Sequence, residues 1–265
     1  MKKCLFAIVL LYPGQYASAD ATFEFNSLIP KNNQHSLTYY IKNARLKYTD
    51  ATSASDNIYD HKSKQFTSLN KKTGKVSSIN EQILNRQVAR LNEQRMNKLV
   101  SIEKELNQKL STKTDLEKQT GENLINRLKY PEHYGEHSLL NIKELKKTKQ
   151  INNIKCQRFQ LFRQHELLKE YCMASAADLG INQQEYKTLR GFYAFDYNTQ
   201  SKIMIAMGNT RFAIVDYDQQ KIPGVVIETI SYEDNQITQH QVLKSVNNDS
   251  LNDSIFSLNN ENKTQ

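Results

Sequence analysis

The stretch IKCQRFQLFRQHELLKEYCM, residues 154–173, decides the fold that the sequence predicts. Its two ends are strand-like runs, and the polar residues between them form a turn, which is the pattern of a β-hairpin. Folding the hairpin about Gln164 places Cys156 opposite Cys172. Directly opposed residues of antiparallel strands have α-carbons about 4.5–5.5 Å apart, a separation that a disulfide accepts. We therefore predict a structural disulfide between these cysteines, worth roughly 3 kcal/mol through loop closure.

The same register sorts the side chains of the hairpin onto two faces. It places Phe159 opposite Lys169 and Leu161 opposite Leu167. The odd-numbered face is apolar and is expected to point to the core, with Phe159, Leu161, Leu167 and Tyr171. A redox-active role for the cysteines would need a C-x-x-C spacing or a site that stabilises a thiolate, and the sequence shows neither.

Strand-like runs on both sides of the hairpin extend it into an antiparallel sheet. A helix is predicted over 181–197, because Tyr186, Leu189, Tyr193 and Tyr197 recur at helical spacing beside Phe192, although Gly191 weakens it. These elements predict an α+β protein. Its other strands are expected at 22–25, 37–48, 57–59, 66–69, 76–78, 142–151, 203–207, 212–217, 222–232 and 237–246.

A helical stretch interrupts the strands between residues 79 and 128. It contains no Pro and one Gly, and Ser77 or Ser78, with Glu81, can cap its start. Its narrow apolar stripe predicts one amphipathic helix lying on the sheet. The alternative is a projecting helical hairpin that binds a partner. The stripe consists of Ile79, Ile83, Leu84, Val88, Leu91, Leu99, Ile102, Leu106 and Leu110.

The first 19 residues have the pattern of a signal peptide. Two lysines precede an apolar run at 5–12, and Ala-Ser-Ala at 17–19 predicts cleavage after Ala19. Cleavage removes Cys4 and leaves an even pair of cysteines, which suits an oxidising compartment. We therefore expect a soluble periplasmic protein made of one domain at 20–258, followed by a disordered tail at 259–265.

The composition argues against several functional classes. The 265 residues carry a formal net charge of +8, and 38% are hydrophobic. The basic charge would suit nucleic acid, but secretion takes the protein away from nucleic acid, so no such partner is expected. No run beyond residue 12 is apolar enough to cross a bilayer. The cluster Lys143, Lys146, Lys147 and Lys149 predicts a solvated strand face, with acidic lipid head groups or lipopolysaccharide as the alternative.

Catalytic and metal-binding motifs are also missing from the sequence. We find no G-x-S-x-G elbow, no Gly-rich phosphate loop and no distinct pair of carboxylates. His133 and His137 have a zinc-like spacing, but Pro131 and Gly135 argue against the helix that would hold a metal, so a polar loop is favoured. We predict a protein that is not an enzyme and uses no cofactor or metal.

A series of short motifs runs along the chain in one order. They are YYIKNAR (39–45), IYD (58–60), FTSLN (66–70), NIKCQRF (153–159), IPGV (222–225) and IFSL (255–258). With the first strand, the series resembles the LolA-like periplasmic proteins, which include the lipoprotein carriers LolA and LolB and the envelope-stress regulator RseB. The stretch 79–128 then corresponds to a helical insertion, and Asn153 replaces the usual Gly.

The resemblance implies an incomplete antiparallel barrel with helices across its concave face. The helix at 181–197 would be a lid whose Tyr186, Leu189, Phe192, Tyr193 and Tyr197 pack as core, the favoured interpretation, or line a pocket for an acyl chain. The implied function is a non-enzymatic binding protein for a lipid or lipoprotein acyl chain. The alternative is an envelope protein-interaction or regulatory module that acts through residues 79–128.

Overall fold

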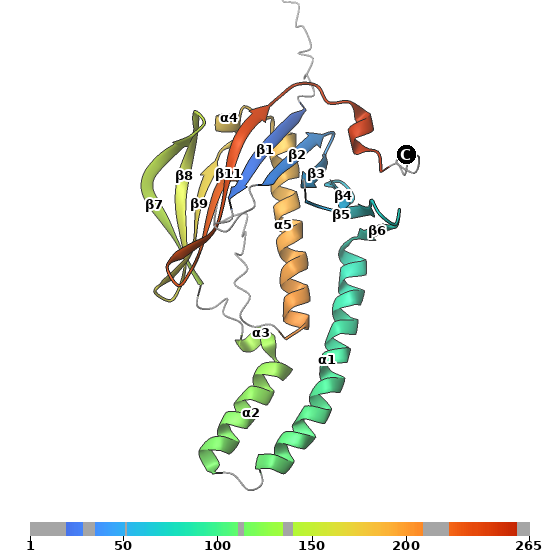
Figure 1. The fold of residues 1–265 in the computed structure, drawn as a ribbon, viewed down its shortest axis with the longest axis vertical. Coiled ribbons are helices and arrows are strands. Elements are labelled where there is room, and N and C mark those ends of the chain that lie inside the picture. The colour runs from blue at the N-terminus through green and yellow to red at the C-terminus, as the bar shows by residue number, and fades with distance from the viewer. Residues whose placement is uncertain are drawn as a thin grey trace, which may run out of the picture.

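The protein is described from a computed structural model, which covers residues 20–28, 35–50, 52–110, 114–134, 140–208 and 223–258 (Figure 1). The strands are β1 (Ala21–Leu28), β2 (His35–Lys42), β3 (Arg45–Asp50), β4 (Ser55–Asp60), β5 (Gln65–Asn70), β6 (Val76–Ile79), β7 (Leu140–Ile151), β8 (Ile154–Arg163), β9 (Glu166–Ala174), β10 (Val225–Glu233) and β11 (Gln236–Asn247). The helices are α1 (Glu81–Leu110), α2 (Asp115–Lys129), α3 (Pro131–Tyr134), α4 (Ala176–Leu179), α5 (Gln183–Ala206) and the 3-10 turn η2 (Asp253–Phe256).

The strands form one 11-stranded sheet in the order β6-β5-β4-β3-β2-β1-β11-β10-β9-β8-β7. Every neighbouring pair is antiparallel. The edges β6 and β7 do not pair with each other, so the sheet is curved but unclosed. Bulges in the β1–β11, β9–β10 and β7–β8 pairs bend the strands and strengthen their twist. The predicted α+β class and curved antiparallel sheet are confirmed.

The sheet curves around α5, which lies across its inner face (Figure 1). Leu189 and Phe192 of this helix are buried in a cluster to which β1 to β4 and β7 to β11 all contribute. Aromatic rings dominate the contact: the ring centroid of Phe192 lies 5.7 Å from that of Tyr48 and 5.8 Å from that of Tyr59. Burying such large rings supplies much of the apolar contribution to stability. The helix therefore fixes the curvature of the sheet.

The helical stretch forms a hairpin, so the prediction of one helix lying on the sheet was wrong. Helices α1 and α2 project away from the sheet side by side (Figure 1), and they contact each other. The second helix starts where Thr114 and Glu117 form a reciprocal capping box. Asn80, not Ser77 or Ser78, caps α1, because its Oδ1 accepts the backbone N–H of Ile83 at 3.0 Å. The projecting alternative describes the arrangement correctly.

The hairpin of β8 and β9 contains the predicted disulfide between Cys156 and Cys172, with α-carbons 5.4 Å apart. The predicted register was wrong by two residues, because Cys172 lies opposite Arg158. One shift comes from a two-residue turn at Gln164 and His165, and the other from a bulge at Leu168. The disulfide therefore joins diagonal neighbours.

The bulge also changes which leucine reaches the core of the hairpin. Leu168 is buried beside Phe159, Leu161 and Tyr171, whereas Leu167 is half-buried. The prediction for Leu167 was therefore wrong, and the other three predictions for this face are confirmed. A bulge shifts side chains between the faces of a strand, because one extra residue breaks the alternation.

Helix α5 is longer than the sequence predicts. Residues 203–206 continue it, so the strand expected at 203–207 was wrong. The signal peptide at 1–19, the strand at 212–217 and the tail at 259–265 lie outside the described residues. Within the described part of the chain, none of the helices has the length and apolar character needed to span a membrane.

Candidate functional site

A cavity of about 680 Å³ lies between the β4–β5 turn, the start of α1 and one face of α5. Its volume falls within the range of small-ligand pockets, about 300–1,000 Å³. The contributions of α5 recur every three or four residues, so they form a single helical face. The lining residues are Tyr59, His61, Lys64, Glu81, Leu84, Tyr186, Lys187, Arg190, Gly191, Ala194, Phe195, Asn198 and Pro223.

The deep side of the cavity is apolar. Tyr59 and Leu84 are 2% and 1% exposed, and the ring of Phe195 lies 5.4 Å from that of Tyr59. These three side chains come from β4, α1 and α5, so the cavity depends on the packing of all three elements. A chain of methylene groups placed here would exchange water for aromatic and aliphatic contacts.

Gly191 makes room for one wall of the cavity. A β-carbon at this position would lie 2.3 Å from Nδ1 and 2.6 Å from Cε1 of His61. The imidazole of His61 therefore packs directly against the backbone of α5. A glycine inside a helix costs about 1 kcal/mol relative to alanine. The close approach of His61 explains why this helix contains one.

The rim of the cavity carries several charged groups. Lys64 and Lys187 are exposed at their outer ends, and Glu81 lies in the first turn of α1. Partial burial, followed by the charge of Lys64, lowers the pKa of His61 below its ordinary value of 6.5. Lys187 adds to this lowering and Asp60 opposes it. His61 is therefore neutral at pH 7, and the two lysines supply the positive charge beside it.

Tyr186 and Arg190 join the cavity to the start of β10. The hydroxyl of Tyr186 accepts the backbone N–H of Gly224 at 3.0 Å, and Nη1 of Arg190 donates to the Gly224 carbonyl at 2.8 Å. The guanidinium also lies 6.0 Å from the Tyr186 ring centroid. Tyr186 and Pro223 line a second cavity of about 350 Å³ as well, so they separate two hollow regions.

Four residues of the expected lid pack in or against the core, namely Tyr186, Leu189, Phe192 and Tyr193. Leu189 and Phe192 are buried in the core, and Tyr193 packs against it. Tyr197 is half-buried. Tyr186 also lines the cavity. The other lining residues of α5 lie on the helix face next to the one that carries the expected lid residues. Sequence reasoning missed His61, Lys64 and Lys187. The signal available in the sequence was Gly191 in the middle of the predicted helix. A glycine at such a position marks a close approach of another group to the helix backbone.

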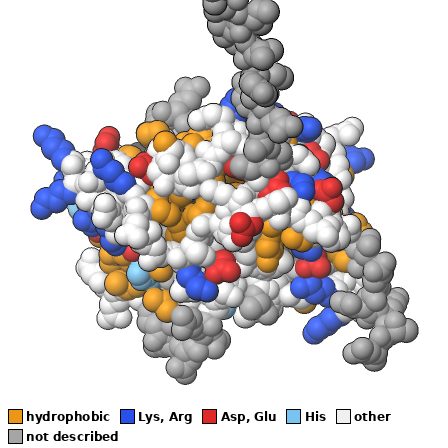
Figure 2. Space-filling view, turned by 90° about the horizontal axis from the view of Figure 1, so that it is seen from above, with side chains coloured by type: hydrophobic (Ala, Val, Ile, Leu, Met, Phe, Trp, Pro, Cys, Tyr) orange, Lys and Arg blue, Asp and Glu red, His pale blue; other side chains and the backbone are white. Residues whose placement is uncertain are grey.

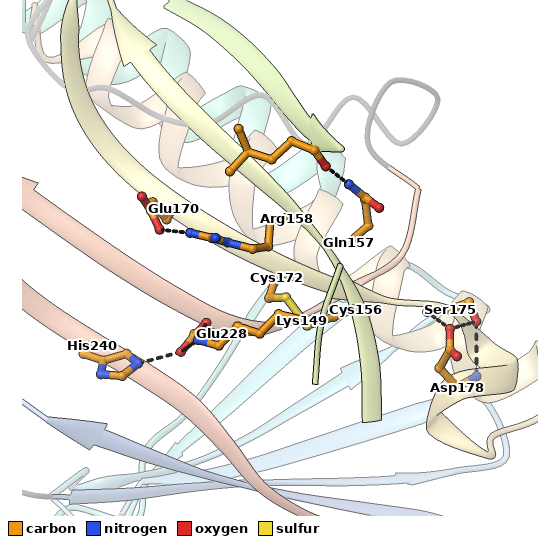
Figure 3. The surroundings of a disulfide bond; sticks show 11 residues. Lys149, Cys156, Gln157, Arg158, Glu170, Cys172, Ser175, Asp178, Glu228 and His240 are labelled. Atoms are coloured by element: carbon orange, nitrogen blue, oxygen red, sulfur yellow. Dashed lines mark hydrogen bonds and ion pairs between the residues drawn. A yellow bond between two sulfur atoms is a disulfide. The ribbon is translucent and has the colours of Figure 1, made fainter. Parts of the chain in front are cut away.

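The disulfide between β8 and β9 lies beside an ion pair that connects the two flanking strands, β7 and β10 (Figure 3). Lys149, opposite Cys156, reaches Glu228, opposite Cys172, with an Nζ–Oε2 distance of 2.7 Å. Nε2 of His240 lies 3.0 Å from Oε1 of the same carboxylate. Both cysteines are at most 2% exposed. Such burial makes the sulfur atoms inaccessible to a redox partner, which suits a structural disulfide.

The basic cluster of β7 divides into paired and exposed side chains. Lys149 is held by Glu228, and the other three lysines are exposed along an edge strand. Lysines on an edge strand discourage further strand pairing. Positive and negative side chains are interspersed on the described part of the face in Figure 2. The exposed members of the cluster are Lys143, Lys146 and Lys147.

A metal centre is not found among the residues that the structure describes. No three side chains of His, Cys, Asp or Glu gather there in a metal-binding arrangement. His133 lies in the short helix α3, where its ring stacks 5.7 Å from that of Tyr130. His137 lies outside the described residues.

No known protein-family model matches the chain, and no curated protein matches it significantly in sequence. The LolA-like resemblance therefore stays a prediction.

Proposed function

We propose that the protein is a non-enzymatic binding protein of the periplasm that holds the apolar chain of a lipid or lipoprotein in the 680 Å³ cavity. The observation that carries the proposal is the cavity itself, with its aromatic and aliphatic deep side beneath a charged rim. The centre of the curved sheet is filled by α5. The cavity beside α5 is therefore a better candidate than the concave face.

The resemblance to LolA-like carriers agrees with this proposal, but fold likeness alone does not assign a ligand. The proposal also includes secretion, because the first 19 residues have the order of a signal peptide. Among the described residues, no group of three His, Cys, Asp or Glu side chains is placed to hold a metal ion.

Binding can be tested with delipidated protein and a panel of fatty acids and lipopeptides. We expect the melting temperature to rise with ligand concentration, because a ligand that binds only the folded state stabilises it. Ala194→Phe fills the cavity and should abolish the shift. Ala89→Phe, at an exposed position of α1, is the matched control and should keep it. A full panel without any shift would reject the proposal.

The projecting hairpin of α1 and α2, here called the helical arm, supports a second candidate function, the binding of a protein partner in the envelope. Large apolar side chains are exposed along it, from 40% for Met96 to 73% for Leu116. Exposed apolar side chains in such numbers are typical of interaction surfaces. The set comprises Met96, Val100, Ile102, Leu116, Leu124 and Tyr130.

Partner capture can be measured by cross-linking in the native envelope. The variant Val100→Lys/Leu116→Lys should lose the partner and keep the circular dichroism spectrum of the folded protein. Asn97→Lys/Asn123→Lys adds the same charge at exposed polar positions and serves as the control. Equal capture by both variants would exclude the arm as the binding surface.

A further inference from the structure

Two lysines at the rim of the cavity have no anionic partner among the residues that the structure describes. Lys64 follows β4 in the β4–β5 turn, and Lys187 lies in the second turn of α5. Neither forms an ion pair or a side-chain hydrogen bond with any residue that the structure describes. Some lysines of the sheet do have carboxylate partners, as Lys42 has Asp20 and Lys149 has Glu228.

These two lysines come from segments far apart in the sequence, and both line the cavity together with His61. Lys64 reaches it from the β4–β5 turn and Lys187 from α5. Gly191 keeps His61 against α5, so the turn stays next to the helix. The packing therefore places two positive charges in the lining of one cavity.

An apolar chain alone would suit this arrangement poorly. When it fills the cavity, water leaves the neighbourhood of the ammonium groups, and such desolvation costs free energy unless an anion replaces the water. Glu81 also lines the cavity, but a single carboxylate cannot neutralise both Lys64 and Lys187. The cavity retains an excess of positive charge.

The geometry points to an anionic single-chain amphiphile as the ligand, with a carboxylate or phosphate head group at Lys64 and Lys187 and an apolar chain against Tyr59, Leu84 and Phe195. This inference rests on the proposed binding function and adds the chemical class of the ligand. Both head groups accept hydrogen bonds from ammonium groups, and such charge-assisted bonds are stronger than neutral ones. The head-group chemistry therefore decides which lipids bind.

The test compares three ligands with the same palmitoyl chain, each below its critical micelle concentration: palmitate, lysophosphatidic acid and the neutral monopalmitin. Isothermal titration calorimetry gives the three affinities. We expect both anions to bind on the order of tenfold more tightly than monopalmitin, the effect of two modest ion pairs. The ratio between palmitate and lysophosphatidic acid distinguishes a carboxylate from a phosphate ligand.

The double variant Lys64→Met/Lys187→Met should remove this preference and leave the affinity for monopalmitin unchanged. The control Lys62→Met/Lys147→Met changes the net charge equally at exposed positions that do not line the cavity, and it should keep the preference. Glu81→Gln should strengthen the binding of both anions.

The outcomes separate the two proposals. Binding of all three ligands with equal affinity, or a preference that survives in the lysine double variant, would overturn the anionic class and keep the binding function. Failure of all three to bind would overturn both. Thermal unfolding of each variant shows whether it is folded, and Lys64→Met or Lys187→Met alone replaces the double variant if that one is not.

Discussion

The imidazole of His61 lies against the backbone of α5 at Gly191, so close that a β-carbon there would be 2.3 Å from Nδ1. This relationship connects the β4–β5 turn to the helix that fills the sheet. It positions one wall of the cavity, and it makes the two residues depend on each other.

Gly191→Ala should destabilise the protein by about 1–3 kcal/mol, because the new methyl group overpacks against the ring of His61. In the background His61→Ala, the same substitution should stabilise it by about 1 kcal/mol, since alanine is the better helix former. Urea unfolding of the four proteins in a double-mutant cycle measures the difference. Additive effects of the two substitutions would contradict the contact.

His61 should make the protein less stable in acid. Burial lowers its folded-state pKa, so the folded protein disfavours the protonated imidazole. The stability that neutral His61 contributes is complete above the unfolded-state pKa of about 6.5 and is lost as the pH falls toward the folded-state pKa. Urea unfolding at pH 7.5 and pH 5 should therefore show a smaller loss for His61→Gln than for the wild type. An equal loss would refute this prediction.

The tyrosines around α5 should ionise late in alkali. Burial raises the pKa of Tyr59 to about 12, and it raises the pKa values of Tyr39 and Tyr193 as well. The protein contains 14 Tyr and no Trp, so absorbance at 295 nm follows tyrosinate directly. These groups stabilise the fold fully below pH 10, and that contribution is lost as the pH rises past 10. We expect a late class of tyrosines that becomes titratable only on unfolding.

Removal of the disulfide should lower the stability by about 3 kcal/mol, the value for a loop of this length. The disulfide joins two cysteines that are 16 residues apart in the sequence. Cys156→Ser/Cys172→Ser gives the measurement by urea unfolding. Peptide mapping without reduction should recover Cys156 and Cys172 in one linked peptide pair, and two free thiols at these positions would disprove the bond.

The sequence was informative where local pattern decides the structure. Alternating residues located β1, β5 and β11 within a few positions, and the two cysteines located the hairpin. The register failed because a one-residue bulge leaves no local mark at Leu168. Ile203 and Ile205 suggested a strand, yet they continue α5, where Arg95 of α1 donates to the Ile205 carbonyl at 2.9 Å. That contact between two helices cannot be predicted from the local sequence.

The cavity was harder to predict, because its walls combine residues from distant parts of the chain. His61 and Gly191 meet only after the sheet has curved around α5. The break between α1 and α2 did have a signal, since Thr114 and Glu117 form a capping-box pair within the expected helix. The predicted apolar stripe also ends just before this pair, at Leu110.

Helix α1 begins at the cavity and ends at the far end of the arm. Its first turns supply Glu81 and Leu84 to the cavity wall, and its 30 residues span about 45 Å. Halfway along α1, Arg95 donates to the Ile205 carbonyl of α5, so the helix is also held beyond its first turns. One continuous helix therefore forms part of the cavity wall at its start and part of the projecting hairpin at its end.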